Sequence, residues 1–72
     1  MSASIFEGSD QYAGCFGVME DGAILYDASF YKNTAERIAE LENADTKPLD
    51  WEETEAILEA EGFNTANPKD EQ

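Results

Sequence analysis

The chain of 72 residues contains no histidine, a single cysteine and only four lysine or arginine residues. The absence of histidine removes the commonest general base and metal ligand, which excludes Ser-His and Cys-His catalysis and histidine-ligated zinc. Cys15 alone cannot form an internal disulfide, so no disulfide framework holds the fold together. Four bases are too few for the positively charged footprint of a nucleic-acid-binding protein, so no direct contact with nucleic acid is expected.

Long hydrophobic runs are also missing. None approaches the roughly 20 apolar residues that a transmembrane helix needs, so no membrane association is expected. The first ten residues, MSASIFEGSD, lack the basic start and apolar middle of a signal peptide, which predicts a cytoplasmic protein. A chain of this length has room for one hydrophobic core, so we expect a single small domain over residues 1–63 and a flexible polar tail over residues 64–72.

Acidic residues are abundant instead. Asp and Glu number 17, which gives a formal net charge of −13. Such a charge repels DNA, RNA and anionic lipids, so a partner drawn by charge must be basic: a basic protein, a polyamine or a metal cation. A high net charge is typical of disordered chains. The hydrophobic content of 42%, with aromatic residues spread along most of the chain, nevertheless predicts a compact domain.

The first half of the chain has the two-residue period of β-strands. Apolar side chains occupy even positions on both sides of Glu20-Asp21-Gly22, a hairpin turn signal, which predicts a β-hairpin over about residues 11–31. Gly8-Ser9-Asp10 is a second turn signal. The sheet therefore has two strands, or three if Ser4–Glu7 also pairs.

Two registers of this hairpin can be drawn. A two-residue loop at Asp21-Gly22 would place Asp27 opposite Phe16 and mix charge into the apolar face. A three-residue loop with a bulge at Gly22 makes one face continuously apolar, and we expect this second register. Its pairs are Val18 with Ile24, Phe16 with Tyr26, Gly14 with Ala28 and Tyr12 with Phe30.

The second half has a helical period. Asn33 and Glu36 form a capping-box-like start for a helix over about residues 34–44. Asp50 is a good N-cap for a second helix over about residues 51–61, and Gly62 is a good stop. The predicted fold is therefore α+β: a two- or three-stranded antiparallel sheet followed by two helices.

The acidic side chains of the second predicted helix fall on one face. At about 100° per residue, Glu52, Glu55 and Glu59 occupy one narrow sector, away from most of the apolar residues. The first helix repeats the theme with Glu36 and Glu40, whose four-residue spacing is slightly destabilising. With the acids of the hairpin turn added, the candidate partner-binding residues are Glu20, Asp21, Glu36, Glu40, Glu52, Glu55 and Glu59.

Other interpretations of this acidity stay open. A charged helix face is usually a solvated face, and acid-rich surfaces also occur throughout the proteins of salt-adapted cells. Glu20-Asp21-Gly22 lacks the spacing of a calcium loop, and neither a GxGxxG nor a P-loop pattern is present. We therefore expect no catalytic residues, no metal site and no cofactor.

In size, acidity, the Glu52/Glu55/Glu59 stripe and the missing catalytic residues, the chain resembles small acidic phage-encoded inhibitors that act as DNA mimics, of the anti-CRISPR and anti-restriction type. The resemblance implies a non-enzymatic inhibitor whose carboxylates occupy a Lys/Arg-lined DNA groove. The implied partner is a basic, DNA-handling protein such as a CRISPR effector subunit. The alternatives are an antitoxin-like or regulatory module that binds a basic protein through Trp51 and Phe63, and a generic acidic domain of a salt-adapted host.

Overall fold

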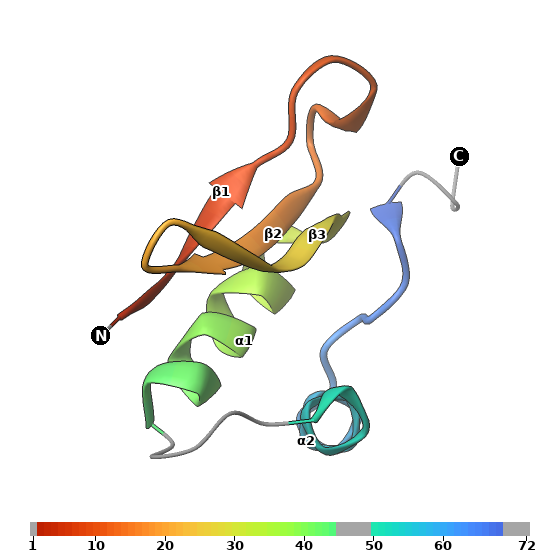
Figure 1. Ribbon diagram of the computed structural model, residues 1–72. Helices are drawn as coiled ribbons and strands as arrows, with labels where there is room; N and C mark the ends of the chain where they lie inside the picture. The colour runs from red at the N-terminus through yellow and green to blue at the C-terminus, as the bar shows by residue number, and fades with distance from the viewer. Residues whose placement is uncertain (1, 45–49, 69–72) are drawn as a thin grey trace.

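The computed structural model describes residues 2–44 and 50–68, which form a three-stranded antiparallel sheet and two helices (Figure 1). The α+β prediction is confirmed, and the open question of a third strand is settled, because residues 3–7 pair with the second strand. The elements are β1 (Ala3–Glu7), the 3-10 turn η1 (Asp10–Tyr12), β2 (Phe16–Glu20), β3 (Ala23–Phe30), α1 (Lys32–Ala44) and α2 (Trp51–Glu61). The sheet order is β1-β2-β3; α1 packs on β1 and β2, and α2 packs on α1.

The turn between β2 and β3 has two residues, so the predicted three-residue loop is wrong. Glu20 pairs with Ala23, and the intervening Asp21 and Gly22 have φ angles of 52° and 82°. Both angles are positive, as in the type I′ turn that an Asp-Gly sequence favours and whose twist suits a hairpin. The register then shifts twice in β3, which carries extra residues relative to β2.

These bulges correct the predicted register. Val18 pairs with Tyr26 and Phe16 with Phe30, so the predicted pairs Val18–Ile24, Phe16–Tyr26, Gly14–Ala28 and Tyr12–Phe30 are not formed. The extra residues of β3 bring Tyr26 and Phe30 to the buried face, which removes the clash of charge and apolar residues that a regular two-residue hairpin would have. Ile24, by contrast, pairs with Met19 and is 58% exposed.

The bulged part of β3 lies very close to β2 at Gly17. A Cβ atom at Gly17 would meet the carbonyl oxygen of Tyr26 and would lie 2.8 Å from the ring of Phe6. Only glycine therefore fits between β1 and β3 at this point. The first strand of the predicted hairpin also begins later than expected, at Phe16 and not near residue 11: Tyr12 belongs to η1 and is 47% exposed.

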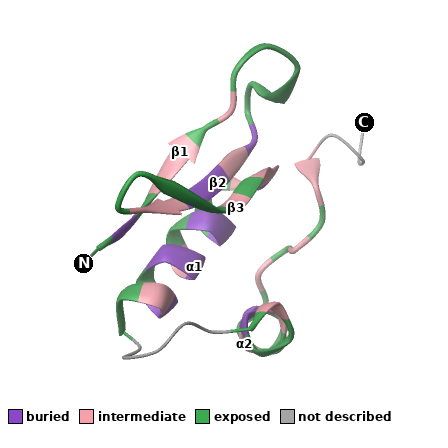
Figure 2. Ribbon diagram, viewed as in Figure 1, coloured by how far each residue is buried: buried purple, intermediate pink, exposed green. Residues whose placement is uncertain are grey.

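The core lies between the sheet and α1, where the buried residues of both elements gather (Figure 2). Val18, Ile38 and Leu58 are completely buried, and Phe30 closes the core at the end of β3. Within the described part of the chain every buried side-chain polar atom has a hydrogen-bond partner; the Thr34 hydroxyl, for example, donates to the Asn64 carbonyl at 2.7 Å. Asn43 joins α1 to β1, because its side chain accepts from the Ala3 N–H at 2.6 Å and donates to the Ala3 carbonyl at 3.0 Å.

The helix ends differ in how well the sequence predicted them. Helix α1 begins directly after β3, and the Ala35 N–H donates to the Tyr31 carbonyl, so the predicted cap at Asn33 is wrong. Asp50 does precede α2, but its carbonyl, and not its side chain, accepts hydrogen bonds from Thr54. The stop at Gly62 is confirmed.

Gly62 ends α2 with a φ of 88°. Its N–H donates to the Glu59 carbonyl, and the N–H of Phe63 donates to the Leu58 carbonyl, which is the paired pattern of a Schellman motif. Phe63 then packs against the core. The described part of the predicted tail, residues 64–68, returns toward the sheet, where Asn67 lies 3.9 Å from the Cys15 sulfur. Residues 69–72 lie outside the described residues.

Candidate functional site

The three acids predicted to form a stripe lie on the outer side of α2. Glu52 and Glu59 are exposed and Glu55 is half-buried, whereas the buried positions of this helix are Thr54 and Leu58. Among the described residues, no ion pair or hydrogen bond engages the three carboxylates. The stripe is therefore a solvent-facing row of charge, with successive acids separated by about 4.5 and 6 Å of helix rise.

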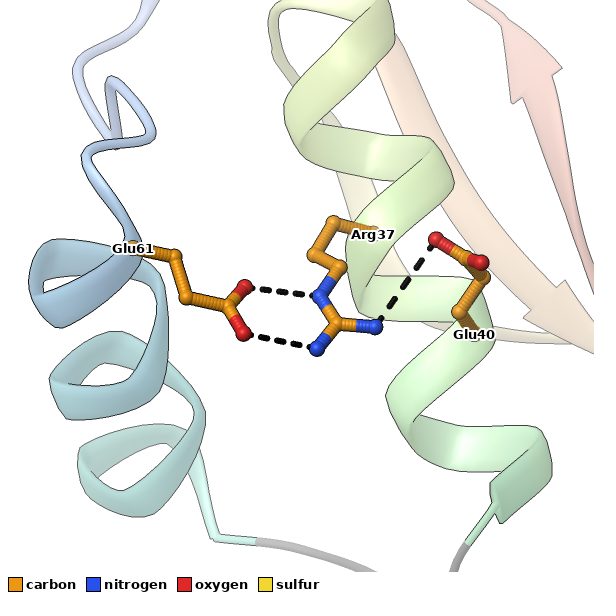
Figure 3. Close-up of polar contacts among 3 residues, drawn as sticks. All are labelled: Arg37, Glu40 and Glu61. Atoms are coloured by element: carbon orange, nitrogen blue, oxygen red, sulfur yellow. Dashed lines mark hydrogen bonds and ion pairs between the residues drawn. The ribbon is translucent and has the colours of Figure 1, made fainter.

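Glu61 belongs to the same helix but faces the other way. Arg37 of α1 donates from Nε to Glu61 Oε1 and from a terminal nitrogen to Oε2, both at 2.7 Å (Figure 3). Glu61 therefore points toward α1. At about 100° per residue, Glu52 and Glu59 lie roughly 160–180° around the helix from Glu61, and Glu55 lies roughly 120° from it, so the stripe is turned away from the contact with α1.

The Arg37–Glu61 pair accounts for an acid placed at the C-terminal end of α2. An acid near the C-terminus of a helix is disfavoured by the helix dipole. Its bidentate contact with a guanidinium, the strongest geometry for a carboxylate, compensates for that position. The hydrogen bonds from Arg37 hold the pKa of Glu61 below its usual value, and the same contact raises the pKa of Arg37.

The lowered pKa of Glu61 predicts a pH-dependent contribution to stability. A carboxyl whose pKa is lower in the folded state stabilises the fold above its unfolded pKa and loses that effect as the pH falls through the folded pKa. Glu61→Gln should therefore lower the melting temperature at pH 7, and the difference from wild type should shrink below the usual glutamate pKa of 4.5. Thermal melts at several pH values, followed by circular dichroism, measure this difference.

Glu59→Gln is the matched control, because it removes the same charge from α2 at an exposed position. It should leave the melting temperature unchanged or raise it, since it relieves repulsion without breaking the pair. If the two variants melted alike at pH 7, the Arg37–Glu61 contact would contribute nothing to stability.

The two acids of α1 occupy the helix surface that faces solvent. Glu36 is exposed, and the side chain of Glu40 is 69% exposed at 3.9 Å from Arg37. Arg37 therefore partly compensates Glu40, although its short contacts are to Glu61. The α1 acids adjoin the α1–α2 junction, whereas the stripe on α2 lies beyond it.

The acids of the hairpin turn lie apart from both helices' acids. Asp21 is exposed and Glu20 half-buried at the β2–β3 turn, which lies on the opposite side of the molecule from α2 (Figure 1). The seven candidate residues therefore form three separate groups. The structure brings together Glu52, Glu55 and Glu59, places Glu36 and Glu40 on a second surface, and leaves Glu20 and Asp21 at a third.

Little in the described chain neutralises these groups. Asp45, Asp70 and Glu71 lie outside the described residues, as do Lys47 and Lys69, which leaves 14 acids against two bases. The two bases are Arg37, already paired, and Lys32 at the start of α1. The folded domain therefore concentrates negative charge on a small surface.

This self-repulsion predicts that salt stabilises the fold. Raising the ionic strength from 0.01 to 0.1 M shortens the Debye length from about 30 to about 10 Å, which screens repulsion between separate acidic groups. The melting temperature should therefore rise over this range. A flat or falling curve in a calorimetric salt series would show that the acids are compensated locally.

The remaining titratable residues of the described chain are dispersed or buried. Within residues 2–44 and 50–68, no three Cys, Asp or Glu side chains lie close enough to hold a metal ion. Cys15 is 1% exposed and packs as a small core residue. The Tyr26 hydroxyl lies against Thr54 and Glu42, and burial is the main cause of its raised pKa. No helix in the described part of the chain is long and apolar enough to cross a bilayer.

No protein family, curated protein or solved structure matches the chain. Its function is therefore inferred from the chemistry of its own surface.

Proposed function

We propose that the protein is a non-enzymatic inhibitor that binds a basic, DNA-handling protein by presenting carboxylates in place of DNA phosphates. The observation that carries this proposal is the row of Glu52, Glu55 and Glu59 on the outer side of α2. Duplex DNA presents about one charge per 1.7 Å of its axis and is held in grooves lined by Lys and Arg. A rigid helix with an acidic face offers such a groove a row of charges of the same sign, at the wider spacing of about 4.5 and 6 Å.

The acidic groups on α1 and at the hairpin turn contribute to binding through long-range attraction. The pairs at α1 and at the hairpin turn do not share a face with the stripe, so one flat groove does not contact all seven residues. They add to the overall negative field, which accelerates association with a basic partner and depends on ionic strength. The stripe supplies the contacts, and the remaining acids supply attraction.

The resemblance to small phage-encoded inhibitors suggests the partner and the cell in which the protein acts. The partner would be a CRISPR effector subunit, bound at the surface that reads the target-flanking motif or receives duplex DNA. The protein would act in the cytoplasm of an infected bacterial host, and it would need neither cofactor nor catalytic residue. Its effect would be to block recognition of target DNA.

The antitoxin-like alternative requires Trp51 and Phe63 as contact residues. Their packing in the core disfavours contact with a partner. The Trp51 ring lies 5.6 Å from the Tyr26 ring and 5.5 Å from the Phe30 ring, centroid to centroid. Both Trp51 and Phe63 are half-buried against the core. Exposing either side chain to a partner would therefore cost core packing.

Competition with DNA tests the proposal. The tagged protein is used to capture partners from bacterial lysate with and without nuclease, and each captured protein is purified. Duplex DNA should then displace the inhibitor from its partner, and added salt should weaken the complex, as it weakens contacts between phosphates and Lys or Arg. A partner that binds duplex DNA and the inhibitor together would contradict DNA mimicry.

A further inference from the structure

The face of the sheet that is turned away from the helices contains a hollow of about 530 Å³. Phe6 belongs to this face, because it alternates along β1 with residues that pack toward the core. Ile24 belongs to it as well, because it pairs with the β2 residue that follows a core residue. The volume is within the range of pockets that hold small ligands, about 300–1,000 Å³. Residues that line it include Phe6, Tyr12, Ile24, Asp27, Ser29 and Asn67.

One wall of the hollow is a tightly held loop. The Tyr12 N–H donates to the Ser9 carbonyl at 2.9 Å, and the Cys15 N–H donates to the Tyr12 carbonyl at 3.0 Å. Gly8 closes the loop onto Cys15, and a Cβ at Gly8 would lie 2.5 Å from the Cβ of Tyr12. The position of Tyr12 is thus fixed before any ligand arrives, although its side chain remains 47% exposed.

The chemistry of the wall selects for a cation with an apolar part. Asp27 contributes an acidic residue at an exposed position, and among residues 2–44 and 50–68 no lysine or arginine lines the hollow. The Ser29 hydroxyl donates to the Asp27 carbonyl at 3.3 Å, which leaves the hydroxyl oxygen as an acceptor. Two aromatic rings and Ile24 add apolar surface, and an aromatic ring face attracts cations.

We propose that this hollow binds an arginine side chain presented by a basic segment of a partner protein. The planar guanidinium stacks on an aromatic ring and donates several hydrogen bonds in fixed directions, which suits a wall of rings, a carboxylate and hydroxyl or amide oxygens. Lysine, a strongly hydrated point charge, fits the same wall less well. The charge of −13 favours a basic segment over a second copy of this chain.

The hollow is separate from the α2 stripe. Binding of arginine to the hollow can therefore be measured with a peptide, without the partner and without DNA. The probe is the peptide acetyl-Gly-Arg-Gly-amide, titrated into ¹⁵N-labelled protein and followed by NMR. We expect saturable shifts at the amides of Gly8, Tyr12 and Ser29. The corresponding Lys peptide should bind more weakly, and the Gln peptide should give no saturable shifts.

Asp27→Asn should weaken binding of the Arg peptide about tenfold, because a hydrogen bond to a charged group contributes roughly 1.4 kcal/mol or more. Glu53→Gln is the matched control: it removes the same charge from an exposed position in the first turn of α2, away from the hollow. The control should bind within about twofold of wild type. Equal losses in both variants, equal binding of Arg and Lys peptides, or shifts centred on α2 would overturn the proposal. None of these outcomes bears on the DNA competition test.

Discussion

Phe30→Ala should destabilise the domain by about 3–5 kcal/mol, the usual cost of removing a buried phenylalanine. Phe30 is 7% exposed at the end of β3, and its ring lies 6.2 Å from Tyr26 and 5.5 Å from Trp51. The substitution would remove the centre of a three-ring cluster that joins the sheet to α2. A domain of 72 residues has a total stability of about 4–10 kcal/mol, so the variant would be at the margin of folding.

Thermal denaturation followed by circular dichroism measures this effect. For a domain of this size, a loss of 3 kcal/mol should lower the melting temperature by at least about 12 °C. The matched control is Ile24→Ala, on the same strand but 58% exposed, which should cost less than about 1 kcal/mol. If Ile24→Ala were as damaging as Phe30→Ala, Ile24 would have to face the core.

The order and type of the elements could be predicted because they depend on local patterns. The two-residue period gave way to a helical one near Asn33, and Gly62 marked the end of α2 correctly. The hairpin register could not be predicted, because it depends on bulges that are stabilised only by long-range packing. A regular two-residue turn would have placed Asp27 opposite Phe16, and the extra residues of β3 opposite Gly17 remove that conflict.

The candidate site was also predicted only as far as local patterns determine it. Helical periodicity sufficed to group Glu52, Glu55 and Glu59, because residues three and four apart share one face of any α-helix. How the three acidic groups lie relative to one another depends on how α1 and α2 pack. The Arg37–Glu61 contact spans 24 positions and was missed; its one signal was an acid placed unfavourably near a helix C-terminus.

Changing Glu52, Glu55 and Glu59 to lysine should abolish binding to the basic partner while leaving the fold intact. Like charges placed against one another at an interface cost several kcal/mol, which corresponds to a loss of about 100-fold or more in affinity. Substitutions at exposed positions such as Glu52 and Glu59 usually change stability by less than about 0.5 kcal/mol each, and at the half-buried Glu55 the aliphatic stem of lysine covers the same helix surface as that of glutamate. Here they also reduce self-repulsion, so the melting temperature should not fall.

The control for this variant must change the net charge equally. Glu20→Lys, Glu36→Lys and Glu40→Lys together raise the charge from −13 to −7, as the stripe variant does, because each Glu→Lys change adds two units. These residues lie outside the stripe, at the hairpin turn and on α1. The control loses long-range attraction but keeps the α2 contacts, so its affinity should fall by less than about tenfold.

The dissociation constants of these two variants and of wild type for the captured partner, measured by calorimetry at one ionic strength, test DNA mimicry by α2 most directly. A loss of about 100-fold or more for the stripe variant, with less than about tenfold for the charge-matched control, is the expected result. Equal losses of affinity in the two variants would show that net charge alone accounts for the binding. Wild-type affinity in the stripe variant would show that α2 does not contact the partner.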